Sequence, residues 1–182
     1  RGIIKEEEQE LYQFGIRNGM ILLLNVVTAL VIGLLTEQLA VVAVFTLSFM
    51  VLRSYTGGYH SDSRVFCYLG SNLVLLVPVY TQAVFYKTSL AWLLAVLLVS
   101  AGIIFLLSPM HSKNRKLDKE EQKHFGRKAR LIAALELAVL GILWHAGQIP
   151  YAYAVYTGIC ITALFMLVGK AQLWIQSHTE NG

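Results

Sequence analysis

The chain has 182 residues, of which 56% are hydrophobic and only 14% are charged, and its mean hydropathy is +0.58. This composition excludes a soluble globular domain and predicts an integral membrane protein. The formal net charge is +4. The basic residues lie next to apolar runs and no recognition motif accompanies them, so we expect no nucleic-acid partner.

The first 19 residues mix acidic and apolar side chains at helical spacing. Residues 1–19 are therefore predicted as an interfacial helix on the membrane surface, or else as a solvated lead-in helix. The chain opens on Arg1 without an initiating methionine, so we expect a processed or partial chain, and no cleavable signal peptide is recognisable.

Six apolar runs follow, most of them near the ~17–25 residues that a membrane-spanning helix needs. They cover residues 20–36, 39–52, 68–86, 90–108, 131–146 and 151–169. The second run is short unless its helix continues past Arg53, and four spans with re-entrant segments are the alternative. The predicted fold class is an all-α integral membrane protein with about six transmembrane helices, in one domain that covers residues 1–182.

Residues 109–130, between the fourth and fifth runs, form the most basic part of the chain. Eight lysines and arginines lie there, at positions 113, 115, 116, 119, 123, 127, 128 and 130. The positive-inside rule makes this segment a cytoplasmic loop. Counting runs outward from it places both termini and residues 53–67 on the cytoplasmic side as well.

A candidate nucleophile and its base lie between the second and third runs, where the sequence reads R-S-Y-T-G-G-Y-H-S-D-S-R-V-F-C from Arg53 to Cys67. A thiol becomes nucleophilic when a nearby cation or helix N-terminus lowers its pKa from about 8.5. On one continuous helix, His60 and Cys67 would be about 10.5 Å apart. We therefore expect Gly57 and Gly58 to form a turn that folds His60 back toward Cys67.

Three further polar residues have a functional and a structural interpretation. Asp62 orients the His60 imidazole or caps the third helix. Asn72 donates to an oxyanion or forms an interhelical hydrogen bond. Glu136 is costly in lipid, so it must pair, for example with Arg53 or Arg64, or line a substrate channel.

Neither a metal site nor a disulfide framework is predicted. The histidines other than His60 are scattered, without the spacing of a zinc protease. They are His111, His124, His145 and His178. Cys160 lies in an apolar run, where a cysteine is usually a small buried side chain, and a cytoplasmic Cys67 would stay reduced. The ordinary interpretation of His60 is likewise an interfacial histidine bonded to a backbone carbonyl.

Residues 53–67, together with the later segment L-S-P-M-H-S-K-N-R at residues 107–115, resemble the accessory gene regulator B family of membrane peptidases. The resemblance covers most of the chain. It implies a cysteine endopeptidase of the bacterial cell membrane that needs no cofactor and has its active site on the cytoplasmic side. Such an enzyme cleaves an AgrD-like quorum-sensing propeptide through an acyl-enzyme thioester and promotes its cyclisation to a thiolactone or lactone.

The resemblance also assigns residues within the motifs. His60 and Cys67 match the catalytic positions, and Arg53, Gly57 and Gly58 match the rest of the first motif. In the second segment, the resemblance suggests that basic side chains hold the acidic C-terminal region of the propeptide. These side chains are Lys113, Arg115 and Lys116.

Other classes of protein remain open at this stage. A small polytopic transporter or peptide exporter without proteolytic activity would use the polar residues of the spans as a path, and a non-catalytic receptor is a third possibility. Small residues such as Ala29, Gly33 and Ala133 would permit helix pairing, so we expect a homodimer.

Overall fold

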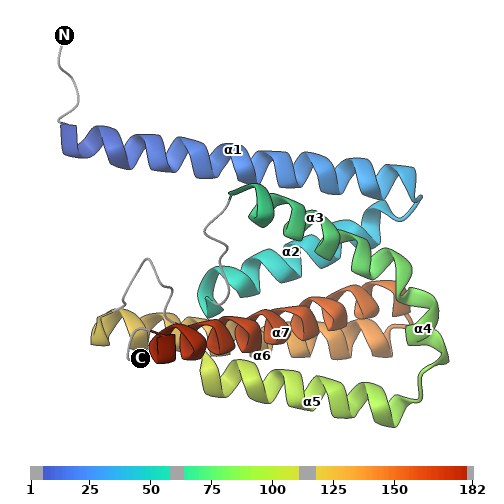
Figure 1. Ribbon diagram of the computed structural model, residues 1–182. Helices are drawn as coiled ribbons and strands as arrows, with labels where there is room; N and C mark the ends of the chain where they lie inside the picture. The colour runs from blue at the N-terminus through green and yellow to red at the C-terminus, as the bar shows by residue number, and fades with distance from the viewer. Residues whose placement is uncertain (1–5, 58–63, 111–117, 180–182) are drawn as a thin grey trace.

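The computed structural model describes residues 6–57, 64–110 and 118–179, and within these ranges helices are the only regular secondary structure. The helices are α1 (Glu6–Leu35), α2 (Leu39–Thr56), α3 (Arg64–Tyr80), α4 (Gln82–Lys87), α5 (Leu90–Leu107), α6 (Lys119–His145) and α7 (Ile149–Thr179) (Figure 1). The predicted all-α fold is confirmed.

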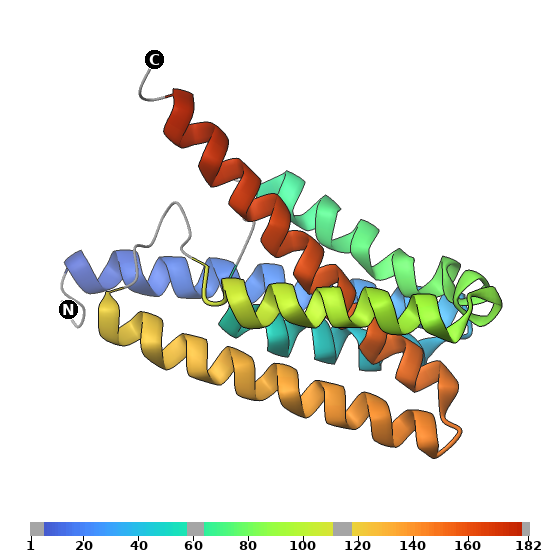
Figure 2. The ribbon, with the colours of Figure 1, turned by 90° about the horizontal axis from the view of Figure 1, so that it is seen from below.

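The long helices run between two ends of one bundle, and α2 and α7 form its centre. Helix α2 contacts α1 and α3 on one side and α6 and α7 on the other, while α7 also packs on α5 (Figure 1). Seen from below, α7 crosses α5 obliquely (Figure 2). Because successive long helices reverse direction, the ends of α2, α5 and α7 lie at the same end of the bundle as the starts of α1, α3 and α6.

Three described helices are long and apolar enough to cross a membrane: Leu39–Thr56, Leu90–Leu107 and Ile149–Ile175. Gly19–Leu35 and Tyr68–Tyr80 are shorter apolar helices. Large apolar side chains point outward along the bundle, as lipid-facing surfaces require, and Leu106 is 82% exposed. These helices support the prediction of a membrane protein, whereas the count of six spans stays a prediction.

Several boundaries differ from those expected. Residues 6–35 form one continuous helix, so the expected surface helix runs into the first span without a break. Helix α2 continues past Arg53 to Thr56, which gives the second span the length it lacked. The third run is divided at Thr81 into α3 and α4, and α3 contains Pro78, whose ring nitrogen has no hydrogen to donate within the helix.

The segment 109–130 was predicted as a loop, and for its second half this is wrong. Residues 119–130 are the first three turns of α6. The reason is a capping box at Asp118, whose side chain accepts from the backbone N–H of Glu121 (2.7 Å) while the Glu121 carboxylate accepts from the Asp118 N–H (3.4 Å).

The buried core lies along α2 and α7. Phe45 and Leu52 of α2 are fully buried, as are Ile159 and Met166 of α7. The small residues expected to pair with another molecule are used inside the chain instead: Ala29 and Ala133 are buried, and a Cβ on Gly33 would lie 2.8 Å from the Leu39 Cα. A homodimer therefore has to use another surface.

Candidate functional site

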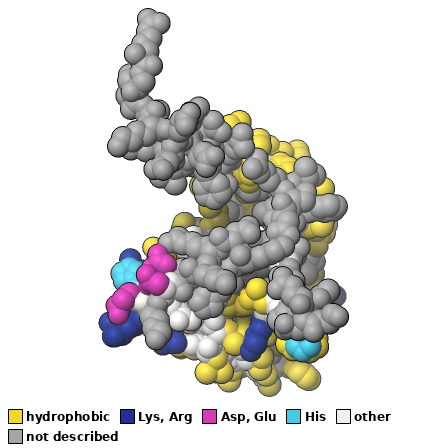
Figure 3. All heavy atoms as spheres, turned by 60° about the vertical axis from the view of Figure 1, so that its left-hand side comes forward, with side chains coloured by type: hydrophobic (Ala, Val, Ile, Leu, Met, Phe, Trp, Pro, Cys, Tyr) yellow, Lys and Arg dark blue, Asp and Glu magenta, His cyan; other side chains and the backbone are white. Residues whose placement is uncertain are grey.

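The described parts of both polar segments that the sequence singled out, residues 53–57, 64–67 and 107–110, lie at one end of the bundle. Helix α2 ends at Thr56 and α3 begins at Arg64 there, and α5 ends and α6 begins at the same end (Figure 1). Figure 3 looks toward this end and shows acidic side chains gathered at one side of it among basic and histidine side chains, with further basic and histidine side chains at the other side. This agrees with the expectation that the two segments face one compartment.

The end of α2 is fixed by its own polar side chains. The Arg53 guanidinium donates from Nη1 to the Gly57 carbonyl oxygen (2.9 Å) and also lies 5.0 Å from the centroid of the Phe165 ring. The Thr56 hydroxyl, which is fully buried, donates more weakly to the same carbonyl (3.4 Å). Arg53 is therefore a helix-terminating residue here, and its charge is held against α7.

The second polar segment contacts the first through the main chain. The backbone N–H of Met110 donates to the carbonyl oxygen of Thr56 (2.9 Å). The charge pattern placed the two segments on one side of the membrane and the resemblance joined them in one family, but neither predicted this bond. A hydrogen bond between backbone atoms does not depend on the residue type, so no sequence motif reveals it.

The predicted catalytic residues lie at the edge of the described chain. Cys67 is the fourth residue of α3, in the first turn of the helix, although its side chain falls outside the described part. His60, Gly58 and Asp62 lie outside the described residues, so the dyad and the fold-back stay predictions. Gly57 is described, and its φ of +71° is a conformation that favours glycine, whereas the turn expected of Gly57 and Gly58 together stays a prediction.

Helix α3 packs on α1 through a polar contact next to Cys67. The hydroxyls of Tyr68 and Thr28 are 2.9 Å apart. Asn72, one turn further along α3, interacts with the Tyr68 hydroxyl, and its Oδ1 atom is buried without a hydrogen-bond partner among the described atoms. Neither the oxyanion role nor the interhelical bond expected of Asn72 is therefore confirmed.

Glu136 of α6 pairs with a hydroxyl. The Ser48 Oγ donates to its Oε2 atom (2.9 Å), and the pair joins α6 to α2. Gly158 of α7 lies against Ser48, and a Cβ at this glycine would be 2.6 Å from the Ser48 Oγ. The structural interpretation of Glu136 fits this arrangement, in which Ser48 is a hydrogen-bond partner. The Arg64 side chain lies outside the described part of the chain, so pairing of Glu136 with an arginine stays a prediction.

Two basic side chains in the first turns of α6 contact the ends of α2 and α5. The Lys128 Nζ lies 5.8 Å from the centre of the Tyr55 ring, and the Tyr55 ring packs against Phe125. The Arg130 Nε donates to the Phe105 carbonyl oxygen at the end of α5 (3.2 Å). The three predicted substrate-binding cations lie outside the described residues; they are Lys113, Arg115 and Lys116.

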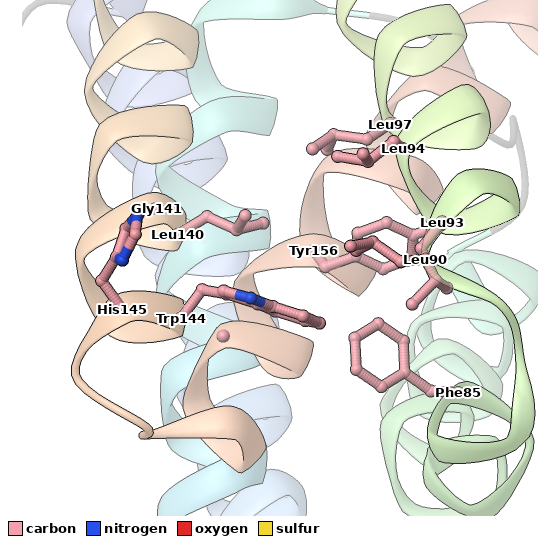
Figure 4. Close-up of a pocket in the computed structure, with 11 residues that line it drawn as sticks. Phe85, Leu90, Leu93, Leu94, Leu97, Leu140, Gly141, Trp144, His145 and Tyr156 are labelled. Carbon is pink, nitrogen blue, oxygen red and sulfur yellow. The ribbon is translucent and has the colours of Figure 1, made fainter.

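An apolar cavity of about 250 Å³ lies at the other end of the bundle, away from the motif. Figure 4 shows the rings of Phe85, Trp144 and Tyr156 around it, with leucines of α5 closing one side. A second apolar hollow shares Phe85 and Tyr156 and reaches Cys160, whose thiol interacts with Ser100 and Tyr156. Cys160 is thus half-buried among apolar and hydroxyl side chains, as expected of a structural cysteine.

Metal chemistry finds no support in the described parts of the chain. No cluster of three or more histidine, cysteine, aspartate or glutamate side chains lies within 6–57, 64–110 and 118–179 in a geometry that could hold an ion. The expectation that no metal or cofactor is needed stays a prediction.

Comparison with known proteins identifies the family. The accessory gene regulator B family matches residues 1–167. Accessory gene regulator protein B of Staphylococcus intermedius is 26% identical over 156 residues, which is 84% of this chain and 80% of that protein. An AgrB-like protein of Clostridium perfringens is 24% identical over 131 residues, which is 69% of this chain and 61% of that protein.

No solved structure matches the chain. The family match covers both polar segments and the helices that carry them. The chain therefore belongs to the accessory gene regulator B family of the agr quorum-sensing system.

Proposed function

We propose that the protein is a membrane cysteine endopeptidase that cleaves an AgrD-like propeptide and promotes its cyclisation. The observation that carries the proposal is the match to the family over residues 1–167, in a chain that keeps the G-G-x-H-x-x-x-x-x-x-C motif from Gly57 to Cys67. The arrangement of the described residues supports it, because α2 ends and α3 begins at the end of the bundle where the second polar segment also lies.

In the proposed reaction, the Cys67 thiolate attacks the scissile carbonyl carbon of the propeptide. His60 gives a proton to the leaving amine as the peptide bond breaks, and the acyl group stays on Cys67 as a thioester. When a cysteine thiolate of the bound peptide attacks this thioester, a thiolactone forms and the Cys67 thiolate is released. One thioester replaces another, so the ring closes at little thermodynamic cost.

Two environmental features would favour the proposed reaction. A site at the edge of a bilayer excludes much of the water that would otherwise attack the thioester. The start of a helix carries a partial positive charge, and this charge would stabilise a Cys67 thiolate, since Cys67 is the fourth residue of α3.

The substrate is proposed to bind through its acidic C-terminal region. Lys113, Arg115 and Lys116 would hold that region electrostatically. Lys128 and Arg130 are less suited to it, because each already has a partner within the protein. The membrane is proposed to be the bacterial cell membrane, with the catalytic end on the cytoplasmic side.

The experiment that tests the proposal is co-expression with the propeptide, comparing the wild type with Cys67→Ala and His60→Ala. We expect cleavage to disappear in both variants at normal membrane levels, and a hydroxylamine-sensitive adduct to form on Cys67 in the wild type. If Cys67→Ala processes the propeptide at the wild-type rate, the peptidase function is wrong.

The alternative of a transporter makes the opposite prediction for the same residue. A transporter tolerates Cys67→Ser, whereas the peptidase does not. The cavity beside Phe85, Trp144 and Tyr156 is lined mainly by apolar side chains, so it offers no polar route for a charged solute.

A further inference from the structure

Three residues after α5, Ser108, Pro109 and Met110, lie between the end of α2 and the first turns of α6. We call residues 108–110 the strap. We propose that the strap is a positioning element for the catalytic segment, and that it acts through the main chain of Met110. The proposal rests on the proposed peptidase function and concerns how that site is held.

On its first side, the strap is in main-chain contact with Gly57. The Met110 N–H donates to the Thr56 carbonyl oxygen (2.9 Å), and a Cβ added to Gly57 would lie 2.6 Å from the Met110 carbonyl oxygen. Contact this close is possible only because glycine has no side chain. Position 57 therefore requires glycine for two reasons: Met110 leaves no room for a Cβ, and the backbone conformation disfavours other residues.

The backbone of Gly57 itself is in an unusual conformation. Its φ of +71° and ψ of −153° lie in a region that is essentially restricted to glycine. Such a conformation persists only when the surroundings hold it. The Arg53 guanidinium and the Thr56 hydroxyl hold the Gly57 carbonyl, and Met110 holds the residue before it.

On its second side, the strap rests on α6. A Cβ added to Gly126 would lie 3.0 Å from the Pro109 Cδ and 3.5 Å from the Ser108 carbonyl oxygen. Gly126 is buried, and so are Ser108 and Met110. The strap is thus enclosed by two glycines, one on α2 and one on α6, and cannot shift toward either helix without a clash.

The consequence for the site follows from the order of residues along the chain. Gly57 is three residues before His60, and the strap fixes the direction in which the chain leaves α2. The proposed dyad requires that direction to bring the imidazole to Cys67, because a misplacement of about 1 Å in a catalytic group can lower the rate by about 100-fold. Met110 is a positioning residue, since it acts through Gly57 and not on the substrate.

The test compares Met110→Pro with Met110→Leu in the full chain, purified in detergent with the propeptide as substrate. Proline removes the N–H that donates to Thr56, whereas leucine keeps it and fills similar space. We expect Met110→Pro to lower kcat by about 10- to 100-fold with KM changed less than threefold. Met110→Leu should stay within about threefold of the wild type in both parameters.

A second pair keeps the test decisive if Met110→Pro does not fold. Gly126→Ala adds a methyl group against Pro109, while Gly141→Ala makes the same change on the same helix where no atom lies within 4 Å. Both variants gain helix propensity. Only Gly126→Ala should lower kcat, because only that variant displaces the strap.

A further readout separates positioning from general stability. In a Cys160→Ala background, Cys67 is the single cysteine, and its alkylation rate by iodoacetamide reports the thiolate as pH varies. In a variant that still folds, displacing the strap should shift the pH dependence of the Cys67 alkylation rate toward that of a free thiol. If Met110→Pro, or Gly126→Ala where the former does not fold, keeps wild-type kcat and alkylation, the strap proposal is wrong. The peptidase function fails separately, if Cys67→Ala still cleaves.

Discussion

Two glycines with nearly the same backbone angle lie at opposite ends of the bundle. Gly57, after α2, has φ +71°, and Gly147, after α6, has φ +70°. A Cβ at Gly57 would meet the Met110 carbonyl oxygen at 2.6 Å, whereas a Cβ at Gly147 would meet nothing within 4 Å. Gly147 is thus required only by the backbone conformation at the end of α6, whereas Gly57 also leaves room for the segment that contains Met110.

The turn at Gly147 shows what that local need is. Its N–H donates to Trp144 and the next N–H, of Gln148, donates to Leu143, which is the hydrogen-bond pattern of a helix that ends in a left-handed residue. Such a turn connects α6 to α7 through local hydrogen bonds and does not depend on contact with another segment of the chain. Of the two glycines, only Gly57 is packed against a distant segment of the chain.

The largest expected effect concerns the two cysteines. Cys67→Ala should lower propeptide cleavage by at least ~1,000-fold, because it removes the proposed nucleophile. Cys160→Ala, at a half-buried position on α7, should retain cleavage within about threefold of the wild type. Cleavage is measured by mass spectrometry of the released peptide. Equal losses in the two variants would show that the effect reflects stability and not chemistry.

Substituting alanine at each of the two glycines tests whether they differ in this way. Gly57→Ala should lower the free energy of unfolding by more than ~3 kcal/mol, since the strain of the backbone adds to the clash with Met110. Gly147→Ala should lower it by only about 1 kcal/mol, the cost of a left-handed conformation for a residue with a Cβ. Denaturant titration in detergent micelles gives both values, and a similar loss at the two positions would contradict the distinction.

Between the two ends, Ser48, Glu136 and Gly158 join three helices. Ser48→Ala should lower the free energy of unfolding by about 1–3 kcal/mol, because Glu136 loses its donor. Gly158→Ala should lower it by about 1–3 kcal/mol through contact with the Ser48 Oγ. The double variant should lose less than the sum, because Ser48→Ala removes the atom that the new methyl group meets. Strict additivity in this double-mutant cycle would contradict the packing.

The smallest expected effect is a gain in stability at the end that carries Gly147. Glu37, after α1, has φ +57°, although it is not a glycine, and its turn has the same bonding pattern, with Gln38 donating to Gly33. Glu37→Gly should raise the free energy of unfolding by about 0.5–1 kcal/mol. The side chain is exposed, so activity should not change. A loss of stability would show that the Glu37 side chain contributes a contact.

Much of the fold could be predicted from the sequence, because a helix that crosses a bilayer must satisfy its own backbone and cover it with apolar side chains. Composition indicated an all-α membrane protein, and every apolar run corresponds to one described helix or to part of one, except the third run, which corresponds to two. The predicted helix boundaries were less accurate where a local feature, such as a helix cap or a break, did not coincide with the end of an apolar run. The capping box at Asp118 turned half of the expected basic loop into helix, and the division at Thr81 shortened the third span.

The sequence by itself also determined which residues to examine, since a cysteine, a histidine and two glycines at fixed spacing form a pattern along one segment. Only the tertiary structure decided what holds that segment. The contacts of Gly57 with Met110, and of Glu136 with Ser48, join positions 53 and 88 residues apart. Spacing along the chain carries no information on such pairs, because helix packing brings them together and one of the two contacts is made by backbone atoms that every residue shares.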